Sequence, residues 1–138
     1  MAIADGKWSL VDGATDTYVY LLRWRDVPDR LERRTFGERI NIFWSMSAPD
    51  ENGLASAAEA MQLEQFENRL APAIEIPEHG ILLAVLTGNG QREFVIQVRE
   101  RAYLLDALHA MPQEAQPYPI AIRAHSDPDW EYYDSLVQ

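Results

Sequence analysis

A chain of 138 residues with 47% hydrophobic content has room for one domain around a single core, spanning residues 1–138. The absence of cysteine excludes disulfides, thiolate nucleophiles and cysteine-based zinc sites. The sequence contains no apolar run of about 18 residues and no secretory leader, and therefore favours a cytoplasmic protein without a membrane segment.

The formal charge of −10 is distributed unevenly along the chain. Residues 1–39 carry seven Lys/Arg and seven Asp/Glu, whereas residues 40–138 carry five and fifteen. All the net negative charge therefore lies in the second segment, where it repels nucleic-acid phosphates and attracts basic partners. Solubility alone is the other interpretation of this charge.

The N-terminal segment, residues 1–38, predicts a strand pair followed by a charged connector. Residues 7–11 and 17–25 are rich in aromatic and aliphatic side chains and predict two strands, joined around Asp12-Gly13 and Asp16. Residues 25–39 predict a surface loop with one helical turn after Pro28. The arginines of this loop could hold an anion, but a solvated connector with salt bridges is favoured.

A strand and a helix come next in the chain. Residues 39–46 alternate apolar and polar side chains, which predicts a central strand, and residues 47–55 predict a loop. Ser56 and Glu59 have the spacing of a capping box, in which each side chain bonds the backbone amide of the other. A helix is therefore predicted from Ala57 to about Leu70, ending before Pro72.

Residues 80–98 predict a β-hairpin whose register is defined by its turn. Asn89-Gly90 suits a type I′ turn, which requires positive φ at both residues. Counting outward from this turn assigns one face to three apolar pairs, namely Val85 with Phe94, Leu83 with Ile96 and Ile81 with Val98. The same count assigns the opposite face to Leu86 with Glu93 and Leu82 with Gln97.

The remaining elements are a helix, a strand and a short terminal helix. Residues 99–110 predict the helix and residues 118–125 the strand. Asp127 and Pro128 suit the N-cap and first position of the terminal helix. Its anchoring face consists of Trp130, Tyr133 and Val137.

From residue 39 to residue 125 the predicted order is strand, helix, hairpin, helix, strand. This βαββαβ order predicts an α+β ferredoxin-like fold, an antiparallel sheet with its helices on one face. The two N-terminal strands should extend the sheet at an edge. Residues 39–138 then form the ferredoxin-like core with the C-terminal helix.

Several short motifs resemble a bacterial family of domains of unknown function, number 695. They are Asn52-Gly53-Leu54 before a helix with Glu59, Leu63, Glu67 and Leu70, then Leu86-Thr87-Gly88, Gly90 and Arg92-Glu93, and finally Asp127-Pro128-Asp129-Trp130 with Tyr133. Ala55 stands where this family often has proline. The Asp-Pro-x-Trp ending is also similar to the regulator of ribonuclease E activity B, which implies an acidic inhibitor of a nuclease.

The sequence offers few groups for catalysis. The three histidines lack metal-ligand spacing and no nucleophile elbow is present, so we assign no catalytic, cofactor or metal residues and expect no cofactor. A carboxylate-based enzyme site is one alternative, with its acids on the first helix and near the C-terminus: Glu59, Glu67, Asp127, Asp129, Glu131 and Asp134. Caps and solvated charge explain these residues equally well.

The favoured function is a small acidic protein-binding module, a regulator or inhibitor of the nuclease-inhibitor or toxin-immunity kind. A sheet with a helix-free face and aromatics at Trp8, Tyr18, Tyr20 and Phe43 would suit docking to a basic protein partner. The candidate partner-binding residues are the charged groups of three segments: Arg30, Arg33, Arg34, Asp50, Glu51, Asp129, Glu131 and Asp134. A nucleic-acid-binding ferredoxin-like domain is a further alternative, disfavoured by the charge. Homo-oligomer formation stays open.

Overall fold

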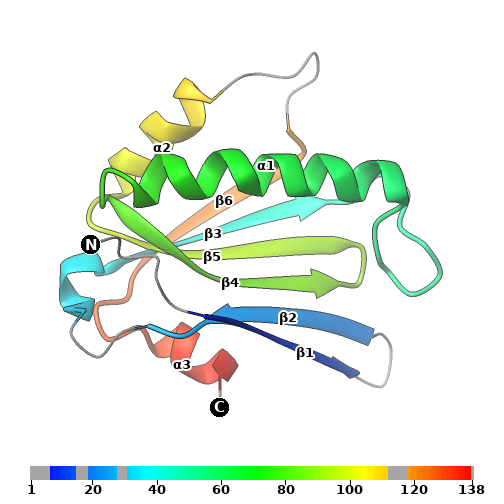
Figure 1. Cartoon of the computed structure of the whole chain (residues 1–138), viewed down its shortest axis with the longest axis horizontal. Coiled ribbons are helices and arrows are strands. Elements are labelled where there is room, and N and C mark those ends of the chain that lie inside the picture. Colours follow the sequence, from blue (N-terminus) through cyan, green and yellow to red (C-terminus); the bar gives the residue numbers. More distant parts are fainter. Residues whose placement is uncertain (1–6, 15–18, 28–30, 112–117, 138) are drawn as a thin grey trace.

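A computed structural model of the chain describes residues 7–14, 19–27, 31–111 and 118–137. Its centre is an antiparallel sheet with the strand order β1-β2-β4-β5-β3-β6 (Figure 1). The strands are β1 Trp8–Ala14, β2 Val19–Arg25, β3 Glu38–Ser45, β4 Gly80–Gly88, β5 Gln91–Val98 and β6 Ile120–Ser126. The helices are η1 Arg33–Phe36, α1 Ala57–Glu75, α2 Arg101–Ala110 and α3 Glu131–Val137. The α+β class and the antiparallel sheet are confirmed, with β1 and β2 extending one edge.

The β4–β5 hairpin has the predicted turn. Asn89 and Gly90 have φ angles of 54° and 81°, and Val85 faces Phe94 across the strands. Glu93 faces Leu86 on the opposite face, also as predicted. Near the turn, the register counted from the sequence is therefore confirmed.

A β-bulge between Leu82 and Ala84 shifts the far half of the hairpin by one residue. Ile96 faces Leu82, Gln97 faces Ile81 and Val98 faces Gly80. The predicted pairs Leu83 with Ile96, Ile81 with Val98 and Leu82 with Gln97 are therefore wrong. Because a bulge adds one residue to one strand, Ile81 and Leu83 turn to the face opposite α1.

The main core lies between the sheet and α1. The predicted inward face of β3 is confirmed, since Ile40, Ile42 and Trp44 are buried there. They pack against a stripe on α1 with helical spacing, which consists of Leu63, Phe66, Leu70 and Ile74. The rings of Phe66 and Trp44 meet edge to face, with centroids 5.5 Å apart.

The helix α1 continues past the predicted end. Ser56 Oγ accepts a hydrogen bond from the Glu59 amide at 3.3 Å, so the predicted start is confirmed. Pro72 lies inside the helix, and the last turn closes through the Ile76 amide on the Pro72 carbonyl at 3.1 Å. A proline usually ends a helix, because it lacks an amide proton. Here Ile74 and Glu75 are buried, so tertiary packing holds the turn in place.

The face of the sheet opposite α1 is partly covered. Figure 1 shows α1 and α2 on one side of the sheet and α3 on the other. A buried cluster joins η1, β4 and α3 on that second side: Phe36, Ile81, Leu83, Trp130 and Tyr133. The expected helix-free docking face is therefore wrong. Trp8 packs against the α1-side core, Tyr20 and Phe43 are half-buried, and Tyr18 lies outside the described residues.

The outer elements differ from prediction at their ends. β1 runs through Asp12 and Gly13 to Ala14, so the predicted turn at these two residues is wrong; the connection falls in residues 15–18, outside the described part of the chain. The helical turn in the connector is the 3₁₀ helix η1. Within the described ranges, no helix is long and apolar enough to cross a bilayer.

Candidate functional site

Asp127 fixes the segment that links β6 to α3. Its buried carboxylate accepts hydrogen bonds from the amides of Glu131 at 3.0 Å and Tyr132 at 3.4 Å. It also pairs with Arg39 Nη1 at 2.9 Å. Asp127 therefore caps the terminal helix as predicted, but the helix begins at Glu131, because a turn at Pro128 intervenes.

Trp130 connects this segment to η1. Its side chain is fully buried, and the indole Nε1 donates to the carbonyls of Arg33 at 3.1 Å and Phe36 at 3.0 Å. Its φ angle is 57°, in the left-handed region that bulky residues rarely occupy. This backbone conformation directs the indole beneath η1, so the connector and the C-terminal segment form one surface.

Two ion pairs cross this junction. Arg33 Nη1 lies 2.9 Å from an oxygen of Asp134, and Arg34 Nη2 lies 2.8 Å from one of Asp129. The Arg33 guanidinium also lies over the Trp130 ring, 5.0 Å from its centroid. The side chains of the Arg34–Asp129 pair are 67% and 60% exposed, so this pair contributes at most about 1 kcal/mol to stability.

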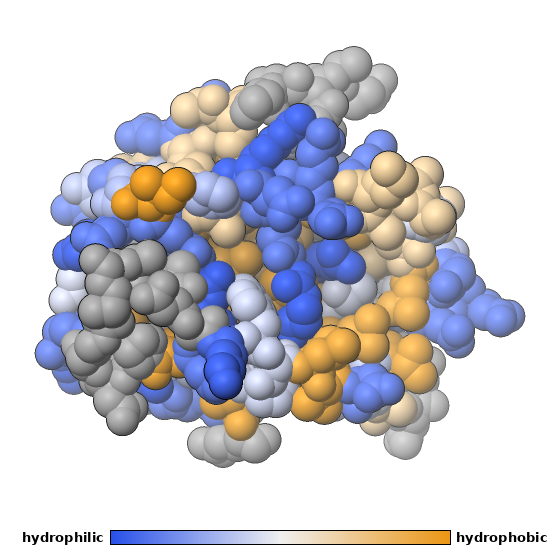
Figure 2. Space-filling view, viewed as in Figure 1, coloured by the Kyte–Doolittle hydropathy of each residue, from blue (hydrophilic) through white to orange (hydrophobic). Residues whose placement is uncertain are grey.

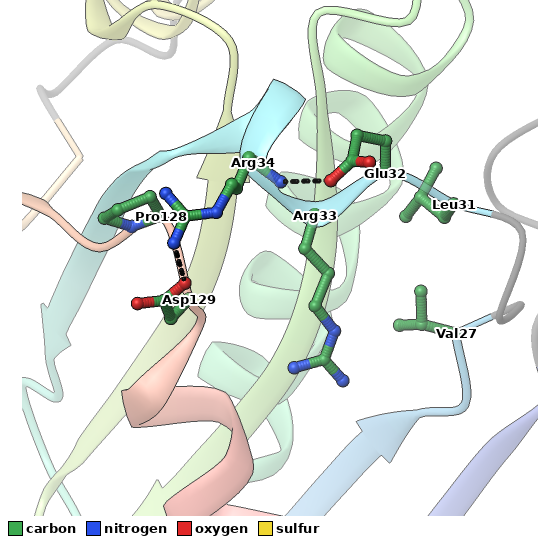
Figure 3. Close-up of a pocket in the computed structure, with 7 residues that line it drawn as sticks. All are labelled: Val27, Leu31, Glu32, Arg33, Arg34, Pro128 and Asp129. Carbon is green, nitrogen blue, oxygen red and sulfur yellow. Dashed lines mark hydrogen bonds and ion pairs between the residues drawn. The ribbon is translucent and has the colours of Figure 1, made fainter.

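A pocket of about 390 Å³ opens at the junction (Figure 3). In Figure 3 the Arg34 side chain reaches across to the Asp129 carboxylate, and the Arg33 side chain projects between Asp129 and Val27. The pocket lining is mostly polar, with charged groups of both signs and a smaller apolar wall. Its lining consists of Val27, Leu31, Glu32, Arg33, Arg34, Pro128 and Asp129.

Acidic and basic groups are balanced in the pocket lining, with Glu32 and Asp129 against Arg33 and Arg34. Asp134 of α3, which pairs with Arg33, adds a third carboxylate at the junction. The Glu32 carboxylate accepts a hydrogen bond from the Arg34 amide at 3.3 Å, and Glu131 is exposed on the first turn of α3. Among the described residues, the junction therefore carries one more carboxylate than guanidinium when Asp134 is counted.

The structure brings together only part of the predicted residue set. Arg33, Arg34 and Asp129 line the pocket, and Asp134 pairs with Arg33, whereas Glu131 is exposed on the first turn of α3. Asp50 and Glu51 belong to the loop before α1, which Figure 1 shows at the opposite end of the sheet from η1. The Asp50 carboxylate accepts hydrogen bonds from the amides of Asn52 and Leu54, which shape that loop. Arg30 lies outside the described residues.

The apolar wall of the pocket is the part that charge counting missed. Val27, Leu31 and Pro128 line it, and all three are half-buried. A signal was present in the sequence, since Val27 and Leu31 are apolar side chains four residues apart in a connector rich in charged residues. This spacing is typical of residues that share one side of a turn.

The carboxylates considered for acid–base chemistry have structural partners. Glu59 is buried, and its oxygens accept from Trp44 Nε1 at 3.0 Å and from the Ser47 amide at 3.0 Å. The predicted return bond from Glu59 to the Ser56 amide is therefore wrong, because the carboxylate instead ties α1 to the end of β3. Glu67 pairs with Arg23 at 2.5 Å. Among the described residues, no group of three or more His, Asp or Glu is placed to hold a metal ion.

A second polar network lies between the sheet and α3. Glu93 is buried, and one of its oxygens accepts from Asn41 Nδ2 at 2.8 Å and from the Tyr132 hydroxyl at 2.7 Å. Arg39 Nε donates to Asn41 Oδ1 at 3.0 Å, and its guanidinium lies over the Tyr132 ring. Burial, reinforced by the bond to Glu93, raises the pKa of the Tyr132 hydroxyl well above its usual value.

Tyr132 should make the protein less stable in alkali. Between the pKa of an unfolded tyrosine, about 10, and the higher native pKa, the folded chain retains a proton that the unfolded chain releases. The free energy of unfolding should therefore fall as the pH rises above about 10. Urea unfolding across this range should show a shallower fall for Tyr132→Phe than for the wild type. The matched control is Tyr103→Phe on α2, and equal slopes for all three proteins would contradict the assignment.

Comparison with known proteins connects this geometry to a family. Residues 7–137 match the model of a family of unknown function, DUF695. The chain belongs to this family. No curated protein and no solved structure matches the chain. Membership of the DUF695 family covers every element described above, from β1 to α3.

The residues that resembled the DUF695 family mostly hold its fold together in this chain. Gly53 has a φ of 78°, and its carbonyl accepts a hydrogen bond from the Gly90 amide at 2.9 Å. A Cβ at Gly53 would lie 2.8 Å from the backbone nitrogen of Asn89, so glycine fits where the loop meets the hairpin turn. Asp127 and Trp130 likewise join α3 to the sheet and η1.

Proposed function

We propose that this DUF695 protein is a small acidic protein-binding module that regulates or inhibits another protein, and that it docks a basic segment of its partner at the pocket between η1 and α3. One observation carries the proposal. The pocket combines an apolar wall of Val27, Leu31 and Pro128 with the carboxylates of Glu32 and Asp129, and a further carboxylate, Asp134, pairs with Arg33 at its edge. Lysine and arginine side chains have an apolar stem and a charged head, and therefore match such a surface.

The charge of the whole chain supports a basic partner. Residues 40–138 carry five Lys/Arg against fifteen Asp/Glu, and α3 with its acidic residues belongs to this part. A surface of one sign speeds the diffusional encounter with a partner of opposite charge. The negative charge of residues 40–138 then attracts the partner, and the pocket binds a basic segment of it.

The ion pairs at the rim of the pocket can be replaced by ion pairs with a partner at little cost in free energy. The Arg34–Asp129 and Arg33–Asp134 pairs are solvent-exposed, so opening either one costs at most about 1 kcal/mol. A cationic side chain of the partner can replace Arg34 at Asp129 with little loss. The displaced guanidinium stays free to meet a carboxylate of the partner.

We further infer that β3, α1, β4, β5, α2 and β6 form a ferredoxin-like unit in a cytoplasmic protein. The spatial order β4-β5-β3-β6, with antiparallel neighbours, supports the topology, as does the position of α1 and α2 on one face (Figure 1). The inhibitor role has further support in the Asp-Pro-x-Trp ending, which is similar to that of the regulator of ribonuclease E activity B.

The test compares two charge-matched double variants. Asp129→Asn with Glu131→Gln removes two exposed carboxylates, one in the pocket lining and one two residues further along the chain, and Asp106→Asn with Glu64→Gln removes two elsewhere on the surface. A partner is captured from cell extract at low salt, purified, and mixed with each protein in stopped-flow experiments. We expect the pocket variant to associate about tenfold more slowly than the wild type at low salt, and the control to stay close to the wild type.

Salt dependence gives the second readout. The wild-type association rate should fall by about an order of magnitude between low and physiological salt, and this fall should be smaller for the pocket variant. Equal rates and equal salt slopes for the two double variants would show that docking occurs elsewhere. Capture of acidic proteins alone would contradict the charge complementarity on which the proposal depends.

A further inference from the structure

The two edges of the sheet differ in how they are protected. The β6 edge exposes Arg123 and His125, and Pro119 precedes the strand. The β1 edge exposes one charged residue, Asp12, but also Leu10, at 65% of its surface, and Val11, at 44%. Charges and proline are the usual protection of an edge strand, whereas an apolar edge can pair with another strand.

The exposed apolar surface extends from β1 onto β2. Leu21 and Val19 are 36% and 41% exposed, and they lie on the same face of the sheet as Leu10. Figure 2 shows hydrophobic surface over β1 and β2 at the lower right of the view. Single exposed apolar residues are normal on a protein surface, but a contiguous patch at a strand edge indicates an interaction site.

Among the described residues, no strand pairs with the outer side of the β1 backbone. The Lys7 carbonyl accepts a hydrogen bond from the Asp26 amide at 2.8 Å, which makes these two residues, next to the Trp8–Arg25 pair, a hydrogen-bonded position of the ladder. Hydrogen-bonded and non-hydrogen-bonded pairs alternate along an antiparallel ladder. The amides and carbonyls of Trp8, Leu10 and Asp12 therefore point away from β2, where the described part of the chain places no strand.

We propose that the protein forms a two-fold dimer in which β1 pairs antiparallel with β1 of a second copy, centred on Leu10. The charge distribution favours a second copy as the occupant over a basic partner, because the net charge of −10 lies entirely in residues 40–138. Residues 1–39 have no net charge, with seven Lys/Arg and seven Asp/Glu, so this edge is where two copies of charge −10 can approach. A basic partner is attracted to the acidic remainder of the chain.

The side chains select the register. Centred on Leu10, the pairing places Leu10 against Leu10 of the second copy and Asp12 against Trp8 of the second copy. Centred on Val11, it would place Leu10 against Asp12 and bring the two Asp12 carboxylates closer together. Like charges nearby on adjacent strands are destabilising, so the register centred on Leu10 is the favoured one. Hydrogen bonds from Trp8, Leu10 and Asp12 then join two sheets into one.

The oligomeric state of the protein tests the proposed pairing of β1 with β1 of a second copy. Sedimentation of the full chain should show a dimer whose fraction rises with protein concentration. Leu10→Lys places two ammonium groups against each other and should raise the dimer dissociation constant about a hundredfold or more. The matched control is Ile122→Lys on the β6 edge, an apolar side chain 38% exposed, which should leave the dimer intact. A wild type that stays monomeric, or a dimer that survives Leu10→Lys, would overturn the proposal.

Single cysteines test the register, because the chain contains none of its own. Leu10→Cys should give a disulfide-linked dimer under mild oxidation, since the two Cβ atoms would face each other across the two-fold axis. Val11→Cys should cross-link less, and Ile122→Cys should stay monomeric on a denaturing gel. Preferential cross-linking through Val11 or Ile122 would show that the Leu10-centred pairing is wrong.

These experiments are independent of the proposed partner site. Leu10 lies on β1, whereas the pocket variants alter α3 and the turn before it. Loss of the dimer in Leu10→Lys with unchanged partner binding would support the dimer alone. Loss of partner binding in the pocket variant with an unchanged dimer would support the partner site alone.

Discussion

Glu75→Gln is expected to lower the free energy of unfolding by about 3 to 5 kcal/mol, because it leaves a buried guanidinium without its counter-charge. Arg25 Nη1 lies 3.1 Å from Glu75 Oε2, and the two side chains are only 6% and 8% exposed. The same oxygen accepts a hydrogen bond from the Leu82 amide at 2.8 Å. Glutamine can still accept that bond but cannot neutralise Arg25. Urea unfolding measures the loss.

A neighbouring pair provides the control. Arg23 and Glu67 also join β2 to α1, but their side chains are 34% and 18% exposed. Glu67→Gln should therefore cost about 1 kcal/mol or less. Adding Arg25→Met to Glu75→Gln should recover most of the lost stability, because no unpaired charge stays buried. A cost for Glu75→Gln no larger than that for Glu67→Gln would contradict this account.

The same glutamate explains why the sequence predicted only half of the hairpin register. The turn at Asn89-Gly90 and the Val85–Phe94 pair follow from local residues, and both were predicted. The bulge between Leu82 and Ala84 places the Leu82 amide against the Glu75 carboxylate of α1. That contact depends on α1 continuing past Pro72, and no local pattern in residues 80–98 indicates it.

The sequence predicted the charged residues of the candidate site but not which of them lie together in the fold. Both the connector and the C-terminal segment stand out as charged, which is how Arg33, Arg34, Asp129 and Asp134 were identified. Their pairing spans about a hundred residues and depends on Trp130 beneath η1. Asp50 and Glu51 have equally strong local charge but lie at the other end of the sheet (Figure 1). Charge alone cannot distinguish the two locations.

The covered second face of the sheet has a similar origin. The sequence predicted the anchoring side of α3, and Trp130 and Tyr133 are indeed buried. It did not reveal which surface the anchor contacts. Because the bulge turns Ile81 and Leu83 outward from the α1 side, an apolar patch arises opposite α1, and the anchor of α3 covers it. Errors in the hairpin register and in the expected helix-free face therefore share one cause.

Trp130→Ala is expected to lower the free energy of unfolding by about 3 to 5 kcal/mol, the usual cost of removing a fully buried indole. The variant also loses the hydrogen bonds from Nε1 to the carbonyls of Arg33 and Phe36. Since these bonds hold η1 to α3, the pocket should lose its geometry even where the chain stays folded. Partner association should then slow in Trp130→Ala at temperatures well below its unfolding transition.

The backbone at Trp130 allows a sharper comparison. Its φ of 57° penalises any residue with a Cβ, whereas glycine adopts this angle without steric cost. Glycine normally destabilises a folded segment by about 0.5 to 1 kcal/mol relative to alanine. At this position Trp130→Gly should be at least as stable as Trp130→Ala, measured by urea unfolding of both variants. A glycine variant clearly less stable than the alanine variant would show that the left-handed backbone carries no strain, and the indole contacts alone would then position the C-terminal segment.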